Sequence, residues 1–248
     1  MALARADLES LLRARQLDRT LTTALPEIDP RDEYALAPSG ITALDARLGG
    51  GFPRGQLSEL VGLRSSGRTS LQLQMLAAAT ARSEIVAIVD VLDMLDVASA
   101  AAAGVDLRRL LWIRGQVVAN PGLCRDMNQR ALDRAIKALT LVLQAGNFGV
   151  VAFDAADAPP HALERLPFTT WRRLQRIIEG SQTACVVVAN APIARSAGGV
   201  SVKLSRAEGE GPRVEDRLFK GLDLEVDVIR ARAHRQENVR VPLSTACY

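Results

Sequence analysis

Apolar residues along this chain occur in short continuous runs that are separated by stretches of helical character. The runs have the length of buried strands, and they cover residues 56–61, 84–90, 110–113, 149–154 and 184–190. Between them, helical periodicity or alanine-rich composition predicts helices over residues 69–82, 97–103, 123–145 and 169–179. Strands that alternate with helices are typical of an α/β fold, in which helices cover both faces of a mostly parallel sheet.

Beyond residue 200 the pattern changes to alternating polarity. This alternation predicts antiparallel strands that extend one edge of the sheet, at residues 201–204, 222–229 and 239–243. Residues 205–221 are rich in glycine and in charge, which predicts a mobile loop. We therefore expect the core domain to cover residues 38–248.

The N-terminal segment has a different character from the core. Residues 1–19 carry five leucines at near-helical spacing among charged side chains, which predicts one narrow apolar face. Residues 20–38 contain three prolines and no clear period, so we expect an extended connector. Residues 1–37 are thus interpreted as a helical arm and linker. The arm either folds back on its own core or docks on a neighbouring molecule, where it would support oligomerisation.

The composition is that of an ordinary globular protein. Hydrophobic residues make up 48% of the 248 residues and charged residues 24%, which excludes disorder over the whole length. Aspartates interrupt the most apolar stretch, residues 85–105, so we expect no transmembrane helix. Acidic side chains near the start replace the apolar run of a signal peptide, and we expect a cytoplasmic protein. The net charge of +3 does not by itself argue for nucleic acid.

Side chains that commonly bind metals or attack substrates are scattered along the chain. Cys124, Cys185 and Cys247 lack the short spacing of a zinc site, and Cys185 lies within a predicted buried strand. His161 and His234 are isolated in the sequence. We therefore expect no metal site built from these residues and no nucleophile with a positioned base.

The most informative segment is residues 61–70, Val-Gly-Leu-Arg-Ser-Ser-Gly-Arg-Thr-Ser, between a predicted strand and a predicted helix. Its two glycines, basic residue and threonine have the spacing of a phosphate-binding loop. In such a loop, backbone N–H groups surround a phosphate, and the positive end of the following helix points at it. The candidate nucleotide-binding residues are Gly62, Ser65, Ser66, Gly67, Arg68, Thr69 and Ser70. The alternative is an ordinary glycine-rich turn.

The basic residue of this loop is Arg68, where phosphate-binding loops have a lysine. A guanidinium is planar and bulkier than an ammonium, so we expect phosphoryl transfer to suffer more than nucleotide binding. Asp154 follows a predicted buried strand, and together with the Thr69 hydroxyl it is a candidate ligand for Mg²⁺. Asp90 ends another such strand. Carboxyl ends of parallel strands meet at one edge of the sheet, where ligands bind in such folds.

The phosphate loop, at residues 65–71, and several segments outside it follow a known pattern, namely residues 39–45, 48–56 and 88–96, with Asn190 and residues 196–199. These segments resemble the RecA family of recombinases. The resemblance implies a RecA-like P-loop NTPase core, ATP and Mg²⁺ as cofactors, and Asp96 as a further nucleotide-binding residue. It also implies that Asn190 senses nucleotide and that residues 196–199 belong to a DNA-binding loop.

The sequence departs from the RecA family where hydrolysis would occur. Leu92 stands where the family places the glutamate that activates the attacking water, and leucine cannot accept a proton. We also expect a shortened first DNA-binding loop and no C-terminal domain of the kind that is usual in the family. A short RecA-like chain with such a site is similar to the ImuA group, whose members are accessory proteins of the bacterial mutasome.

The resemblance to the ImuA group implies a role in damage-induced translesion DNA synthesis. The implied partners are RecA, a Y-family-like polymerase homologue of the ImuB type, and single-stranded DNA. Two alternatives stay open. One is a weak DNA-stimulated ATPase in which Asp93 replaces the missing glutamate, and the other is a cell-division inhibitor of the SulA type.

Basic side chains near the carboxyl ends of the strands are candidates for DNA binding. Some lie beside Trp171 in the predicted helix and others lie after residue 190, and the full set is Arg172, Arg173, Arg176, Arg195, Lys203 and Arg206. Such side chains hold phosphates, and a tryptophan can stack on a base. The alternative is a solvated surface of an arginine-rich chain.

Overall fold

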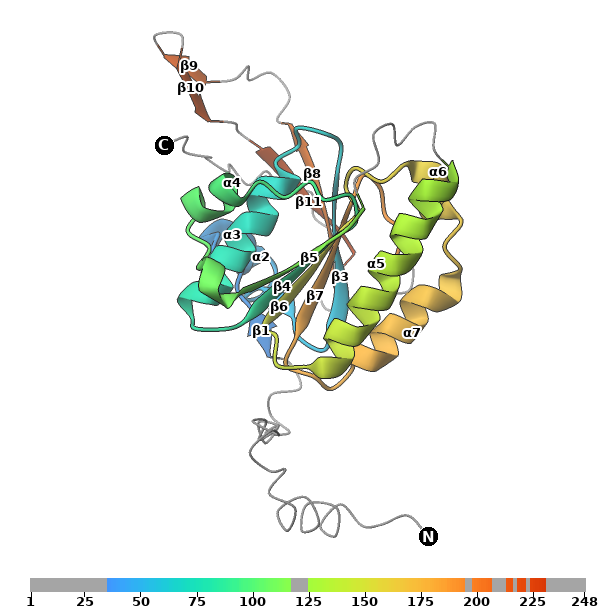
Figure 1. Ribbon diagram of the computed structural model, residues 1–248. Helices are drawn as coiled ribbons and strands as arrows, with labels where there is room; N and C mark the ends of the chain where they lie inside the picture. Colours follow the sequence, from blue (N-terminus) through green and yellow to red (C-terminus); the bar gives the residue numbers. More distant parts are fainter. Residues whose placement is uncertain are drawn as a thin grey trace, which may run out of the picture. The chain divides into compact units, whose positions relative to one another are not determined.

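A seven-stranded sheet organises the chain, which Figure 1 shows as a computed structural model. The structure describes residues 35–116, 125–194, 198–206, 213–215, 218–221 and 224–230. The strands lie in the order β11-β8-β3-β7-β6-β4-β5. Their bounds are β3 Gln56–Gly62, β4 Val86–Asp90, β5 Leu110–Arg114, β6 Val150–Asp154, β7 Ala184–Ala189, β8 Ser201–Arg206 and β11 Leu224–Arg230.

The sheet is parallel except at one edge. All pairings from β8 across to β5 are parallel, and β11 runs antiparallel to β8. The predicted mostly parallel α/β sheet with an antiparallel edge is therefore confirmed. β8 is thus antiparallel to its edge neighbour β11, as expected, but it is parallel to its inner neighbour β3. Hydrogen bonds from the Gly199 N–H to the Leu57 carbonyl oxygen and from the Glu59 N–H to the Val200 carbonyl oxygen start β8 beside β3 in the parallel direction.

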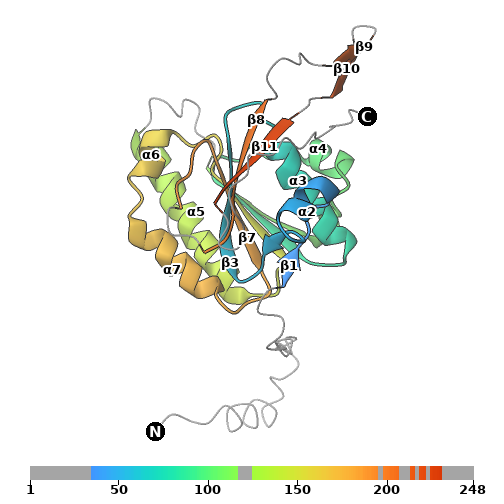
Figure 2. The same cartoon turned by 180° about the vertical axis from the view of Figure 1, so that it is seen from behind.

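Helices cover both faces of the sheet, as the two opposite views show (Figures 1 and 2). One face carries α2, Thr42–Arg47, α3, Arg68–Ala81, and α4, Val97–Ala102, and the other carries α5, Arg125–Ala145, α6, Pro160–Glu164, and α7, Phe168–Ile178. The predictions for α3, α4, α5 and α7 are confirmed. Helices α2 and α6 are too short to show a period. No helix among the described residues has the length and apolar composition to cross a bilayer.

Short strands complete the described fold. β1, Leu36–Ala37, pairs antiparallel with β2, Phe52–Pro53, so the end of the predicted linker joins the core. β9, Arg213–Glu215, and β10, Leu218–Gly221, form an antiparallel pair where we expected a mobile loop. For these two short segments the structure has paired strands where the sequence analysis expected a loop. Residues 1–34, and the strand predicted at 239–243, lie outside the described residues.

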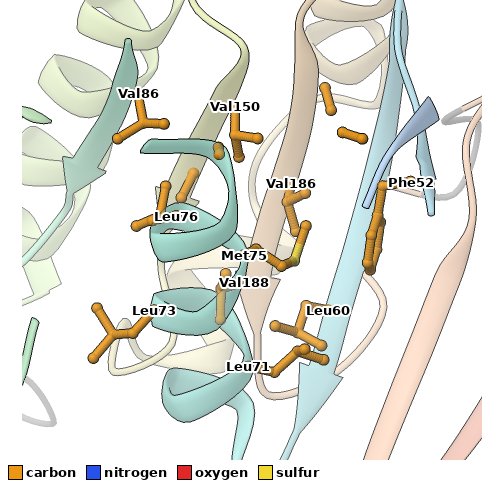
Figure 3. Close-up of a cluster of buried hydrophobic side chains, with 14 of the residues drawn as sticks. Phe52, Leu60, Leu71, Leu73, Met75, Leu76, Val86, Val150, Val186 and Val188 are labelled. Atoms are coloured by element: carbon orange, nitrogen blue, oxygen red, sulfur yellow. The ribbon is translucent and has the colours of Figure 1, made fainter. Parts of the chain in front are cut away.

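The first hydrophobic cluster lies between α3 and the sheet (Figure 3). Leu71, Met75 and Leu76 of α3 are at most 2% exposed. They pack against side chains from four strands of the sheet. Among these side chains are Leu60, Val86, Val150, Val186 and Val188. Burying a side chain of this size contributes about 1.5–3 kcal/mol. This packing fixes α3 on the sheet, and with it the loop that leads into α3.

The second cluster lies on the opposite face, under α5 and α7. Trp171 of α7 is 2% exposed and packs edge-on against Phe153 of β6, with ring centroids 6.3 Å apart. The idea that Trp171 stacks on a base is therefore wrong, because the indole lies in the core. Cys185 of β7 belongs to the same cluster, and its burial raises the pKa of the thiol to about 12. The structural interpretation of Cys185 is confirmed.

Arg54, directly after β2, ties several segments together at the amino-terminal edge of the sheet. Its guanidinium donates to the carbonyl oxygens of Leu36, Gly149 and Gln182 at 2.7–3.3 Å. It also pairs with the Glu84 carboxylate at 2.8 Å. Because Gly149 and Gln182 lie just before β6 and β7, one side chain holds the starts of two central strands.

Replacing Leu139 with alanine is expected to lower the free energy of unfolding by about 2–5 kcal/mol, since a fully buried side chain of α5 leaves a cavity. Leu141→Ala is the matched control, because Leu141 lies on the same helix and is 67% exposed. Its expected effect is within about 0.5 kcal/mol. Urea denaturation followed by circular dichroism measures both, and equal effects would contradict the assignment of the buried face.

Candidate nucleotide site

The candidate phosphate loop connects the end of β3 to the start of α3, as the sequence predicts. Gly67, at the N-cap of α3, has a φ of +82°, a left-handed conformation that glycine adopts without strain. Ser65 also has a positive φ, +63°, which costs a residue with a side chain about 1–2 kcal/mol. Gly67 has no side chain to cap α3, so the first N–H groups of the helix are left for a ligand of the loop.

Arg68, the first residue of α3, turns its side chain into the protein. One guanidinium nitrogen donates to the Gly62 carbonyl oxygen and to the Asn190 side-chain oxygen, and the other donates to the Ala156 carbonyl oxygen over 3.3 Å. Arg68 is only 5% exposed, and burial lowers the pKa of its guanidinium, although an arginine stays charged. In this structure the long, many-donor side chain of Arg68 reaches the protein's own oxygens, and its contact with nucleotide stays a prediction.

Aspartates after β6 balance the positive charge of the loop. Asp157 pairs with Arg64 at 3.0 Å and lies 4.0 Å from the Arg68 guanidinium. The Arg64 side chain is 81% exposed, so its ion pair contributes little to stability. Asp157 and then Asp154 partly offset the effect of burial on the pKa of Arg68. The buried cation is thus neutralised from within the protein.

The other predicted loop residues divide into exposed and buried side chains. Ser65, Thr69 and Ser70 are exposed, so a nucleotide could reach them. Ser66 is 4% exposed, and its backbone N–H donates to the Leu63 carbonyl oxygen over 3.1 Å. Ser66 therefore contributes to the turn of the loop itself, and its contact with nucleotide stays a prediction.

Asp154 and Asp90 end the neighbouring strands β6 and β4 and are partners in the parallel register. The Asp90 carboxylate accepts the Leu95 N–H at 2.8 Å and the Trp112 indole N–H at 3.3 Å, so it organises the turn after β4. Asp154 accepts the Ala156 N–H at 3.0 Å. Burial raises the pKa of the Asp154 carboxyl to about 6, and the charge of Asp90 adds to this effect.

The predicted magnesium ligands, Thr69 and Asp154, offer the hard oxygen atoms that Mg²⁺ prefers. A hydrogen bond from Gln72 of α3 reaches the Asp154 carboxylate, so the start of α3 lies near this side chain. In the described part of the chain, no group of three or more His, Cys, Asp or Glu residues could hold a metal ion by itself. The donor set fits Mg²⁺ that arrives with phosphates, and this assignment stays a prediction.

The turn after β4 contains Asp96, for which the resemblance implies a contact with nucleotide. Asp96 is the N-cap of α4, where its carboxylate accepts the N–H groups of Ala98 and Ser99 and the Ser99 hydroxyl. These hydrogen bonds, with the Ser99 hydroxyl first, lower the pKa of Asp96. Asp96 thus caps a helix in this structure, and its role towards nucleotide stays a prediction. Leu92 is 5% exposed and packs in the second hydrophobic cluster.

Asp93 is held by an ion pair at the end of β5. Its two carboxylate oxygens accept hydrogen bonds from the Arg114 guanidinium at 2.8 and 2.7 Å, and these bonds lower the pKa of Asp93. Its φ of +61° places the residue in the left-handed region. A carboxylate in a two-point ion pair is a weaker base, which argues against Asp93 as a substitute for the missing glutamate.

Glu59, which the sequence analysis did not single out, shapes the same edge of the sheet. It is 1% exposed in β3, and its carboxylate accepts the N–H groups of Ile193 and Ala194 at 2.7 and 2.6 Å and the Ser201 hydroxyl at 2.8 Å. A glutamate within a predicted buried strand was the signal in the sequence, because a buried charge needs such partners.

Gln175 of α7 connects this helix to β3 and to the residues before β8. Its side-chain oxygen accepts the N–H groups of Leu57 at 2.8 Å and Gly198 at 3.2 Å. A Cβ atom on Gly199 would lie 2.6 Å from the Leu57 carbonyl oxygen, so only glycine permits this approach. The glycine pair that resembles part of a DNA-binding loop therefore also has a packing role.

The basic residues predicted to bind DNA lie partly on α7. Arg172, Arg173 and Arg176 are exposed on this helix. The Arg172 guanidinium lies 5.8 Å from the centre of the Phe168 ring, which is 48% exposed. The structure thus brings three of the predicted arginines together, with Phe168 and not Trp171 as the exposed aromatic residue.

The remaining basic candidates lie elsewhere in the chain. Lys203 is exposed on β8. Arg206 ends the same strand, and nothing is described of its side chain. Arg195 lies outside the described residues. DNA binding by these residues stays a prediction.

The raised pKa of the Asp154 carboxyl predicts a pH dependence of stability. Its folded pKa of about 6 lies above the ordinary value of 3.8, so between these values the folded state binds more protons than the unfolded state. The free energy of unfolding should therefore fall by roughly 2 kcal/mol as the pH rises from about 4 to about 6, and this contribution should then level off. Asp154→Asn should remove the decrease and stabilise the protein at pH 7, as measured by urea unfolding at a series of pH values.

The control for this experiment is Asp133→Asn, an exposed position on α5. The Asp133→Asn variant should show the same difference in the free energy of unfolding between pH 4 and pH 7 as the wild type. If the free energies of unfolding of the wild type and of Asp154→Asn change with pH in the same way, burial does not raise the pKa of Asp154.

Sequence comparisons point to one family. The family model of the RecA N-terminal domain matches residues 24–124. Protein RecA of Acholeplasma laidlawii is 37% identical over 122 residues, which are 49% of this chain and 33% of that protein. Protein RecA of Clavibacter michiganensis subsp. michiganensis is 33% identical over 156 residues, 57% of this chain and 39% of that protein. The similarity thus spans well under half the length of these curated relatives.

Solved structures share the fold. The crystal structure of the RadB recombinase aligns with a TM-score of 0.55 and 19% identity over 81% of this chain and 92% of that chain. A KaiC-like protein of Pyrococcus horikoshii OT3 aligns with a TM-score of 0.53 and 20% identity over 84% and 94%. Structural likeness at this identity shows the fold alone. The sequence matches thus make part of this chain similar to RecA proteins, and the solved structures show that it shares their fold.

Proposed function

We propose that this chain is an accessory protein of damage-induced translesion DNA synthesis, which acts by binding partners and carries a degenerate nucleotide site. The observation that carries the proposal is the direction of Arg68. Its guanidinium contacts the protein's own oxygens at the position where a phosphate-binding loop presents a lysine to the phosphates. Without a basic side chain on the phosphates, a RecA-like fold keeps its surfaces for partners but loses a main group for phosphoryl transfer.

The turn after β4 supports the loss of hydrolysis. Leu92 packs in the core and has no group that could orient water. The neighbouring carboxylates are engaged by the protein, since Asp93 pairs with Arg114 and Asp90 accepts two N–H groups. Activation of a water molecule by these side chains would require them to give up their present hydrogen bonds.

The resemblance to the ImuA group supplies the proposed partners, which are RecA and a polymerase homologue of the ImuB type. Single-stranded DNA is the third proposed partner, and the exposed arginines of α7 support it. Guanidinium groups hold phosphates, and the neighbouring Phe168 ring offers a surface on which a base can stack.

ATP and Mg²⁺ are proposed as ligands of the loop. The first N–H groups of α3 would face the phosphates, and Thr69 and Asp154 would hold the ion, directly or through water. Bound Mg²⁺ neutralises phosphate charge. Since Arg68 is directed elsewhere, we propose that nucleotide serves binding rather than turnover.

Purified protein is expected to hydrolyse ATP at least about 100-fold more slowly than a RecA recombinase, because a positioned base contributes about 10²–10⁴ to the rate. A phosphate-release assay with and without single-stranded DNA measures this. The Asp154→Asn variant controls for contaminating ATPases. The protein could instead hydrolyse ATP at a rate near that of RecA, and Asp154→Asn could abolish this activity. That result would replace the proposal with the DNA-stimulated ATPase.

Immobilised full-length protein is expected to retain purified bacterial RecA. Removal of residues 1–34 should weaken this retention, because the leucine face of the arm predicts docking on a neighbouring molecule. The deletion leaves β1 in place, and circular dichroism checks that the core is folded. Failure of the full-length protein to retain RecA would contradict the proposed partner, and unchanged retention by the shortened chain would assign the contact to the core.

A further inference from the structure

Arg68 joins three segments that lie far apart in the sequence. Its acceptors are the carbonyl oxygen of Gly62 at the end of β3, that of Ala156 after β6, and the side-chain oxygen of Asn190 after β7. The strand order places β3, β7 and β6 side by side, so these acceptors converge on one point. A single side chain therefore connects the phosphate loop to the ends of the two next strands.

The segment after Asn190 is anchored to the strand that leads into the phosphate loop. The N–H groups of Ile193 and Ala194 donate to one oxygen of the Glu59 carboxylate, and the Ser201 hydroxyl donates to the other. Because Glu59 lies in β3, the residues between β7 and β8 are held at their start by Arg68 and further along by β3.

We propose that Arg68 is a built-in latch, whose guanidinium takes the place of a nucleotide in joining the phosphate loop to the end of β7. Without nucleotide, the latch keeps residues 190–194 in one arrangement. Nucleotide binds only after Arg68 has left its acceptors. The inference rests on the proposed function in one respect, namely that nucleotide binds at this loop.

The planar shape of the guanidinium explains why this residue is an arginine. A guanidinium presents five N–H donors in a fixed fork, and here its two terminal nitrogens serve three acceptors. A lysine ammonium carries all its donors on one nitrogen, so it cannot occupy both positions that the two terminal nitrogens of Arg68 take up. Arg68→Lys therefore keeps the positive charge of the loop and removes the latch.

Amide hydrogen exchange without nucleotide tests the latch directly. In the full-length protein, Arg68→Lys and Asn190→Ala should each speed the exchange of the Ile193 and Ala194 amides by about tenfold, since the segment loses one of its two anchors. Asn190→Asp keeps an acceptor for Arg68 and should restore slow exchange. Arg64→Lys, at the exposed arginine of the same loop, is the matched control and should behave as the wild type.

Unchanged exchange in both Arg68→Lys and Asn190→Ala would overturn the latch. The pair of variants covers the case in which one of them fails to fold, and circular dichroism identifies that case. Faster exchange in the Arg64→Lys control would also overturn it, because the effect would then follow from any change in the loop.

Measurements of nucleotide binding test whether Arg68 and nucleotide compete at the phosphate loop. Titration of a fluorescent ATP analogue with Mg²⁺ should give about tenfold tighter binding to Arg68→Lys than to the wild type, because a closed state lowers apparent affinity by the fraction of protein that is open. No tightening would show that Arg68 and nucleotide do not compete, and it would overturn the inference.

The outcomes separate this inference from the proposed function. If neither the wild type nor Arg68→Lys binds the analogue, the proposed nucleotide site fails, whereas exchange without nucleotide still decides whether the latch exists. If hydrolysis proves fast, the proposed accessory role fails on the turnover assay alone.

Discussion

A guanidinium that is removed from water needs hydrogen-bond acceptors on several sides, and the burial of Arg68 imposes this requirement on the carboxyl edge of the sheet. The acceptors come from Gly62, Ala156 and Asn190, which only this strand order brings together. The negative charges of Asp157 and Asp154 then compensate the cation. The conformation of the loop, the turn after β6 and the start of the β7–β8 connection are thus parts of one arrangement.

Much of the fold could be predicted because its strands are buried on both faces. Runs such as residues 84–90 and 184–190 are almost purely apolar, and few structures other than a covered parallel sheet accept them. The direction of β8 could not be predicted in the same way. It depends on hydrogen bonds that residues 199 and 200 make with β3, more than 100 positions earlier in the chain.

The site shows the same division between local and distant causes. The spacing of Gly62 and Gly67 locates the loop, because a tight turn between strand and helix is a local property. The direction of Arg68 depends on acceptors 88 and 122 positions away, which no local pattern contains. Trp171 was within reach of sequence reasoning. Its spacing to Leu174 and Ile178 places it on the apolar face of α7, opposite the arginines that had suggested a base-stacking role.

The two tryptophans of the chain occupy separate environments. Trp171 lies sealed between α7 and the sheet, whereas Trp112 sits half-buried on β5 with the Arg114 guanidinium 4.6 Å from its ring centre. The indole N–H of Trp112 donates to Asp90, whose register partner is the titrating Asp154. Indole emission responds to nearby charge, so Trp112 is an intrinsic optical probe of the acidic pair, and Trp171 provides an internal reference that is shielded from solvent.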